Sequence, residues 1–83
     1  MYFVYVLKSN KDGNLYIGFT NNLDRRLREH NNGTNLSTKY RRPFRLIYKE
    51  VVDDRVGARK IEKFLKSGSG REWIKANYRN IRT

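Results

Sequence analysis

Residues 2–19 read YFVYVLKSNKDGNLYIGF, and this stretch decides the fold. Residues 2–7 are wholly apolar and β-prone, which is typical of a strand buried on both faces. The turn that follows, 10–14, contains an Asp-Gly pair, the strongest short-range hairpin signal between two β-rich segments. We therefore expect residues 15–19 to return antiparallel to the first strand. Gly18, at the end of that second strand, indicates a close backbone approach or a bend.

A helix is predicted directly after the hairpin. Either Asn21 or Asn22 can cap its N-terminus, and Gly33 stands where a helix C-terminus favours glycine. The apolar side of this helix recurs at i, i+4 and i+7, at the positions Leu23, Leu27 and His30. Its other positions are mostly cationic, so the helix is amphipathic.

A loop and a third strand follow. Residues 33–42 are polar and basic, and they precede Pro43, the only proline of the chain. Residues 44–52 alternate roughly with period two around Leu46 and Tyr48, which predicts a strand.

Two more helices complete the pattern. Asp53 or Asp54 can cap the first, whose apolar stripe is expected to comprise Ala58, Ile61, Phe64 and Leu65. Ser69 and Glu72 have the spacing of a capping box, which predicts a final helix around Trp73, Ile74 and Tyr78. The predicted order is ββαβαα, an α+β fold with a small antiparallel sheet, and residues 1–83 are expected to form a single domain.

The charge balance points to a polyanionic partner. The chain has 83 residues, 19 Lys and Arg against 8 Asp and Glu, and a formal charge of +11. Aromatic residues make up 13% of it, more than a disordered basic tail carries, so the chain is expected to fold. The usual partners of such a positive field are nucleic-acid phosphates or anionic lipid, and the plainer alternative is a charge that only confers solubility.

Several classes of protein are excluded by composition. Without cysteine the chain has neither a disulfide framework nor a thiolate zinc site, and its one histidine excludes a multi-histidine metal cage. The longest apolar run, 2–7, is far shorter than the ~20 residues of a membrane helix, and no basic region precedes it as in a signal peptide. We expect a soluble cytoplasmic protein that does not enter a membrane.

One set of residues is suited to phosphodiester hydrolysis. This reaction needs a proton acceptor for water, a cation for the developing phosphorane charge and, commonly, a divalent metal on a carboxylate. The predicted elements supply all three from Tyr5, Tyr16, Arg26, His30 and Glu62. Each residue also has a structural interpretation: core tyrosines with satisfied hydroxyls, a structural histidine, and helix-surface charges such as a Glu62–Lys66 pair.

The motifs around these residues resemble a known family. Residues 4–6 read VYV and residues 16–30 read YIGFTNNLDRRLREH, which together are similar to the signature of the GIY-YIG nuclease superfamily. Residues 37–43 (STKYRRP) and 62–68 (EKFLKSG) resemble its small stand-alone bacterial members, so the resemblance covers nearly the whole chain. It implies a three-stranded antiparallel sheet flanked by helices. The catalytic domain of the bacterial excision-repair incision subunit belongs to the same superfamily.

The resemblance implies one role for each residue of the set. Tyr5 corresponds to the tyrosine of the first motif and Tyr16 to that of the second, which is proposed to take a proton from water. Arg26 corresponds to the family arginine, and His30 to the Tyr or His four residues later. Glu62 corresponds to the glutamate that binds Mg²⁺ or Mn²⁺.

The sequence also departs from the pattern. Some relatives carry a lysine three residues after the second tyrosine, where this chain has Phe19. For the late asparagine of some relatives, Asn77 and Asn80 are candidates by residue type alone.

These observations predict a metal-dependent endonuclease that acts on nucleic acid, on DNA rather than RNA, in a process such as DNA repair. The loop residues expected to grip phosphate or stack on a base are Lys39, Tyr40, Arg41 and Arg42. Phe19 motivates an alternative, a basic nucleic-acid-binding module with little or no cleavage activity. A membrane-surface protein is a weaker interpretation, because no helix combines a wide apolar face with a cationic one.

Overall fold

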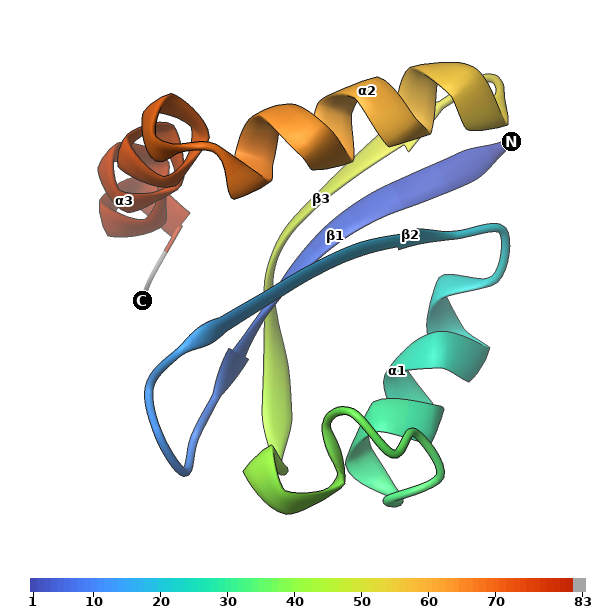
Figure 1. The fold of residues 1–83 in the computed structure, drawn as a ribbon, viewed down its shortest axis with the longest axis vertical. Coiled ribbons are helices and arrows are strands. Elements are labelled where there is room, and N and C mark those ends of the chain that lie inside the picture. The colour runs from blue at the N-terminus through green and yellow to red at the C-terminus, as the bar shows by residue number, and fades with distance from the viewer. Residues whose placement is uncertain (82–83) are drawn as a thin grey trace.

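A three-stranded antiparallel sheet runs through the middle of the computed structural model, which describes residues 1–81, with side chains to residue 77 (Figure 1). Its strands are β1 (Tyr2–Ser9), β2 (Leu15–Thr20) and β3 (Phe44–Val52), in the spatial order β2-β1-β3. β1 is central and pairs antiparallel with both neighbours, which explains why its apolar run is buried on both faces. The predicted hairpin and third strand are confirmed.

Helices cover both faces of this sheet (Figure 1). α1 (Leu23–Asn31) packs on one face, and α2 (Arg55–Lys66) and α3 (Gly68–Ile81) pack on the other. The predicted ββαβαα order and α+β class are confirmed, with a short 3₁₀ turn, Lys39–Arg41, added before β3. Within the described residues, no helix is long and apolar enough to cross a membrane.

Alternate side chains of β1 supply two separate cores. Val4 and Val6 face α2 and α3 and join a cluster with Ile17, Ala58, Leu65 and Ile74. Tyr5 and Leu7 face α1 and join Phe44, with Tyr16, Leu23, Leu27 and Leu46 packed around them. The period-two alternation of a strand thus directs neighbouring residues to different environments.

The third strand breaks the predicted alternation. Val6 pairs with Tyr48 and Leu7 with Leu46, so Ile47 is an extra residue in the ladder. Because a bulge of this kind shifts the side-chain period, Leu46 packs on the α1 side while Tyr48 packs on the α2 side.

Asparagine and aspartate cap the first two helices as predicted. The Asn22 side chain accepts a hydrogen bond from the backbone N–H of Arg25, and the Asp54 side chain accepts one from Gly57. After α1, Gly33 adopts a φ of 84°, a left-handed conformation that glycine reaches without strain.

The predicted cap of the last helix is wrong by two residues. Ser67, rather than Ser69, accepts a hydrogen bond from the third N–H of α3, at Gly70. Ser67 is also the C-cap of α2, so one residue joins the two helices. In this tight junction, a Cβ on Gly70 would overlap the carbonyl oxygen of Phe64. That packing, which sequence spacing does not reveal, requires glycine at position 70.

The predicted apolar stripe of α2 is wrong at one position. Ala58 and Leu65 are buried and Ile61 packs against them, but Phe64 is 48% exposed because it lies on the outer side of the helix. In α3, Ile74 is buried and Trp73 packs edge-on against Tyr48, with ring centroids 5.1 Å apart. The side chain of Tyr78, also predicted to be apolar packing, lies outside the described residues, as does that of Asn80.

Candidate active site

Three aromatic rings from three different elements meet on the α1 face of the sheet. Tyr5 lies on β1, Tyr16 on β2 and His30 on α1. The ring centroids are 6.3 Å apart for the two tyrosines, 6.0 Å for Tyr5 and His30, and 4.7 Å for Tyr16 and His30. We call these three residues the ring cluster. Tyr5 and His30 are almost completely buried, and Tyr16 is partly exposed.

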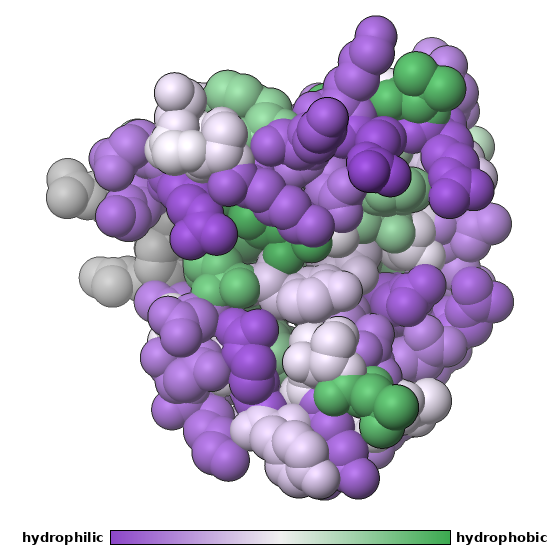
Figure 2. Space-filling view, viewed as in Figure 1, coloured by the Kyte–Doolittle hydropathy of each residue, from purple (hydrophilic) through white to green (hydrophobic). Residues whose placement is uncertain are grey.

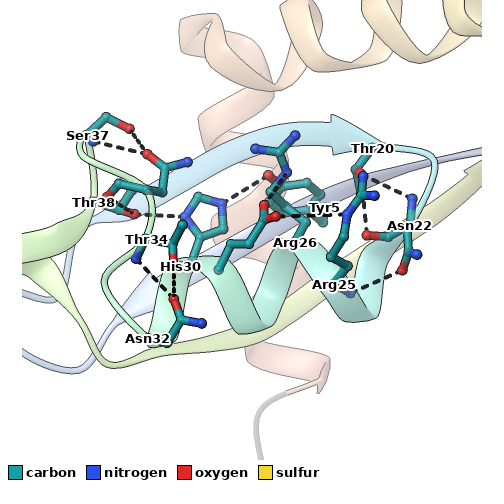
Figure 3. A network of polar contacts seen from close by, with 12 residues as sticks. Tyr5, Thr20, Asn22, Arg25, Arg26, His30, Asn32, Thr34, Ser37 and Thr38 are labelled. Atoms are coloured by element: carbon teal, nitrogen blue, oxygen red, sulfur yellow. Dashed lines mark hydrogen bonds and ion pairs between the residues drawn. The ribbon is translucent and has the colours of Figure 1, made fainter.

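A chain of hydrogen bonds fixes the histidine (Figure 3). The Thr38 hydroxyl, fully buried, is directed at the carbonyl of Asn35, 3.5 Å away. We assign the ring proton to Nδ1, which lies 2.8 Å from the Thr38 oxygen and donates to it. This assignment of the ring proton leaves Nε2 to accept the hydroxyl of Tyr5, at 3.2 Å.

Both protonation states in this chain follow from the surroundings. Burial, together with the neighbouring Tyr16, raises the pKa of Tyr5 well above its usual range, and the charge of Arg26 opposes this shift. Burial, and then the charge of Arg26, lowers the pKa of His30 below its ordinary 6.5. At neutral pH, Tyr5 is thus protonated and His30 is neutral.

Arg26 brings a cation to the edge of the ring cluster (Figure 3). Its Nε lies 3.7 Å from Glu29 Oε1, and its side chain is 36% exposed. Among the described residues this buried Nε has no hydrogen-bond partner. A buried donor without an acceptor is costly, and the guanidinium is suited to two oxygens of a phosphate. The geometry therefore favours an anion beside the cluster.

Gly18 allows Tyr5 to reach the edge of the sheet. A Cβ on Gly18 would lie 2.7 Å from the Tyr5 hydroxyl and 3.3 Å from the ring of Tyr16. The close approach predicted at this glycine is confirmed. The Tyr5 hydroxyl consequently lies over β2, the edge strand.

Glu62 approaches from the other side of this edge. α2 packs against β2, and the negative charge of Glu62 raises the pKa of Tyr5, so the two groups lie within electrostatic reach. The Glu62 side chain is 14% exposed, with Oε2 at 3.2 Å from Lys66 Nζ and Oε1 at 3.7 Å from Arg59 Nε. The structure brings four predicted residues together on the α1 face and leaves Glu62 near them on α2.

Comparison with known proteins agrees with this geometry. Residues 1–77 match the GIY-YIG catalytic domain family. The chain belongs to the GIY-YIG family. The paired strand tyrosines and Gly18 are the parts of its two motifs that form the ring cluster and its glycine neighbour.

The similar proteins are bacterial UPF0213 proteins. One from Staphylococcus saprophyticus is 37% identical over 75 residues, 89% of this chain and 90% of its own length. One from Clostridium perfringens is 42% identical over 67 residues, 80% of this chain and 71% of its own length. The solution NMR structure of a UPF0213 protein from Bacillus halodurans matches with a TM-score of 0.56 and 30% identity, over 92% of this chain and 84% of that one.

In the basic loop of this GIY-YIG protein, some side chains are exposed and others are held by contacts with the rest of the fold. Tyr40 is 74% exposed, and Lys39 Nζ lies 5.4 Å from the centre of its ring. Arg41 instead bonds Asp12, with Nε 3.0 Å from Oδ2, and packs over the ring of Phe44. Arg42 lies over Gly33, where a Cβ would come within 2.5 Å of its guanidinium. Lys39 and Tyr40 are therefore better placed than Arg41 to meet a ligand.

Phe19 points away from the ring cluster. It packs edge-on against Tyr2 on the α2 face, with ring centroids 6.1 Å apart. The guanidinium carbon of Arg55 lies 5.9 Å from the centre of its ring, in a cation–π contact. Phe19 therefore lies on the face of the sheet opposite to Tyr5 and Tyr16.

The donor set fits a weakly held hard cation. Within the described residues, no group of three or more His, Cys, Asp or Glu side chains gathers to form a metal cage. Glu62 offers a carboxylate held by Arg59 and Lys66, whereas Glu29, the other carboxylate near the ring cluster, pairs with Arg25 and Arg26. Mg²⁺ commonly binds one or two carboxylates, waters and substrate phosphate, so the Glu62 carboxylate fits it, although not as a preformed cage.

Thr38 is a functional candidate that sequence analysis missed. It lies in the segment 37–43, which resembles the family, but nothing in its residue type or spacing distinguishes it from the neighbouring polar residues. Its importance comes from a loop that folds back onto a residue eight positions earlier, which local pattern does not reveal.

Proposed function

We propose that this GIY-YIG protein is a metal-dependent endonuclease that hydrolyses phosphodiester bonds of nucleic acid, DNA rather than RNA. The observation that carries the proposal is the meeting of Arg26 with the ring cluster, where its positive charge acts on both Tyr5 and His30. The Arg26 side chain is 36% exposed, so its guanidinium can meet a phosphate. The net charge of +11 draws a polyanion to the site.

The ring cluster supports Tyr16 as the group that takes a proton from water. His30 Nε2 already accepts the Tyr5 hydroxyl, so it takes another proton only by giving up that bond. Tyr16, which is partly exposed and 4.7 Å from His30 between ring centroids, remains to act as the base. Tyr16 first releases its hydroxyl proton to solvent, and the phenolate oxygen then takes a proton from water while the water oxygen forms a bond to phosphorus. The bond from phosphorus to the leaving oxygen then breaks, and that oxygen takes up a proton.

Arg26 and Glu62 have different electrostatic roles. Arg26 bonds the nonbridging oxygens, whose negative charge grows in the transition state. Glu62 would hold Mg²⁺ or Mn²⁺, which supplies further positive charge at the phosphate. Arg59 and Lys66 pair with the Glu62 carboxylate and orient it until the substrate arrives.

A cleavage assay tests the proposal. Linear, nicked and branched DNA and a single-stranded RNA are incubated with the protein in Mg²⁺, in Mn²⁺ and in EDTA. We expect metal-dependent products, and we expect them to disappear in Glu62→Gln but not in Glu72→Gln, a matched change at an exposed glutamate of α3. DNA binding without metal-dependent cleavage would contradict the endonuclease proposal and favour the nucleic-acid-binding module.

The identity of the base is tested in the same assay. Tyr16→Phe is expected to slow cleavage more than His30→Ala, because the phenol takes the proton and the imidazole positions Tyr5. The reverse order would assign the base to His30.

A further inference from the structure

The outer face of α2 is strongly cationic and belongs to no part of the ring cluster. A groove along it is lined by Arg55, Val56, Arg59, Lys60 and Lys63. Figure 2 shows hydrophilic side chains gathered along this edge of the molecule, with small apolar areas between them. The apolar areas of α2 include Val56, 65% exposed, and Phe64, 48% exposed.

Helix geometry places this face directly beside Glu62. At about 100° per residue, Arg55, Lys66, Arg59 and Lys63 follow Glu62 in angular order around α2, and Lys60 lies beyond them. The opposite side of the helix, with Ala58, Ile61 and Leu65, is occupied by the core. The cationic arc therefore starts at the candidate metal ligand and runs outward over the surface.

Helix stability does not account for all of these charges. Lys66 and Arg59 pair with Glu62, and Lys63 suits the negative C-terminal end of the helix. Arg55, however, opens the helix at its positive end, where acidic residues are favoured. Lys60 lies mid-helix, exposed, with no ion pair in the described structure. The ring of Phe19 already contacts Arg55, which leaves Lys60 as the charge that calls for an external anion.

We propose that the outer face of α2 is a second phosphate-binding surface, which holds the backbone of a nucleic acid duplex beyond the segment at the ring cluster. The inference rests on the proposed function for the class of partner. Because the arc begins at Glu62, a backbone that passes Arg26 and Glu62 can continue across Arg55, Lys63 and Lys60. Contacts of this kind position the substrate and carry no base sequence information.

The same face fits a membrane surface poorly. An interfacial helix buries a wide apolar face in lipid, but the apolar face of α2 is already buried against the sheet. The large apolar side chains of α2 that remain exposed are Val56 and Phe64, and Lys60 lies between them around the helix. The duplex is therefore the occupant to test, and anionic lipid vesicles are the competing probe.

The test removes two cations from α2 and compares a matched removal elsewhere. The variant Lys60→Ala/Lys63→Ala leaves Glu62 and its partners intact and keeps good helix formers in place. The control, Lys11→Ala/Lys75→Ala, removes the same charge from the hairpin turn and α3, where both lysines are exposed. Binding of a short DNA duplex is measured in EDTA over a range of salt, with circular dichroism to check folding.

We expect the α2 variant to bind at least about tenfold more weakly near physiological salt, with a salt slope smaller by about 2, and the control to change by less than about threefold. Equal losses in both variants, or no loss in the α2 variant, would overturn the proposal. So would a loss of binding to anionic vesicles that leaves duplex binding unchanged. Since EDTA prevents cleavage, a protein that shows this loss but never cuts DNA would refute the endonuclease and leave the surface standing.

Discussion

The two faces of the sheet use the same strands for different purposes. On the α2 and α3 face, Val4 and Val6 are packed among aliphatic side chains. On the α1 face, the intervening Tyr5 shares its surroundings with a buried histidine, a buried threonine hydroxyl and an arginine. Since successive residues of a strand point to opposite sides, one apolar-looking run builds both a core and a polar site. The apolar face stabilises the platform on which the polar face is held.

The largest effect on stability is expected on the apolar face. Leu65→Ala removes a side chain that is 2% exposed and should lower the free energy of unfolding by about 3 kcal/mol. Leu36→Ala, at a leucine that is 81% exposed, should change it by less than about 0.5 kcal/mol. Urea denaturation measures both, and a similar loss in the two variants would remove the distinction between core and surface.

A smaller loss of stability, with a loss of activity, is expected from Gly18→Ala. The new Cβ must displace the Tyr5 hydroxyl, which is held between Gly18 and His30, at a cost of about 2 kcal/mol. Gly68→Ala is the control, since a Cβ there meets nothing within 4 Å. Normal cleavage by folded Gly18→Ala would show that the position of Tyr5 is unimportant.

Thr38→Val should cost about 1 kcal/mol, because it keeps the shape but leaves His30 Nδ1–H without its acceptor. Thr38→Ser keeps the hydroxyl and should restore both stability and cleavage. Thermal unfolding and the cleavage rate are measured side by side. If Val and Ser behave alike in both, the hydroxyl does not position His30.

The smallest effect is a pH dependence. Because folding lowers the pKa of His30, the unfolded chain binds a proton more readily, and stability should decrease as the pH falls below 6.5. His30→Gln should flatten this decrease, although the variant is less stable throughout. The melting temperature between neutral and mildly acidic pH measures the slope. A slope unchanged in His30→Gln would assign the titration to other groups.

Much of the fold could be predicted because its signals are local. The Asp-Gly turn, the caps at Asn22 and Asp54 and the apolar periods each involve residues a few positions apart. The bulge at Ile47 depends on the pairing of β3 with β1, far apart in the chain, and the cap at Ser67 depends on where α2 ends in the tight junction with α3. Neither feature could therefore be predicted from the spacing of residues in the sequence.

The candidate site shows the same division. The family motifs pointed to the ring cluster, whereas two roles of the loop depend on contacts across the fold. Thr38 reaches His30, and Arg41 bonds Asp12, 29 positions earlier in the chain. The sequence does not show whether a basic loop residue forms an ion pair, because its partner can lie far away in the chain.

The central claim, that Arg26 acts at the ring cluster, is tested most directly against its neighbour Arg25. Both lie on α1 and pair with Glu29, but the side chain of Arg25 is 54% exposed and that of Arg26 36%. In Mg²⁺-dependent DNA cleavage, Arg26→Ala should lower kcat/KM by about 10²- to 10³-fold, and Arg25→Ala by less than about threefold. Equal losses in the two variants, or full activity in Arg26→Ala, would contradict the account.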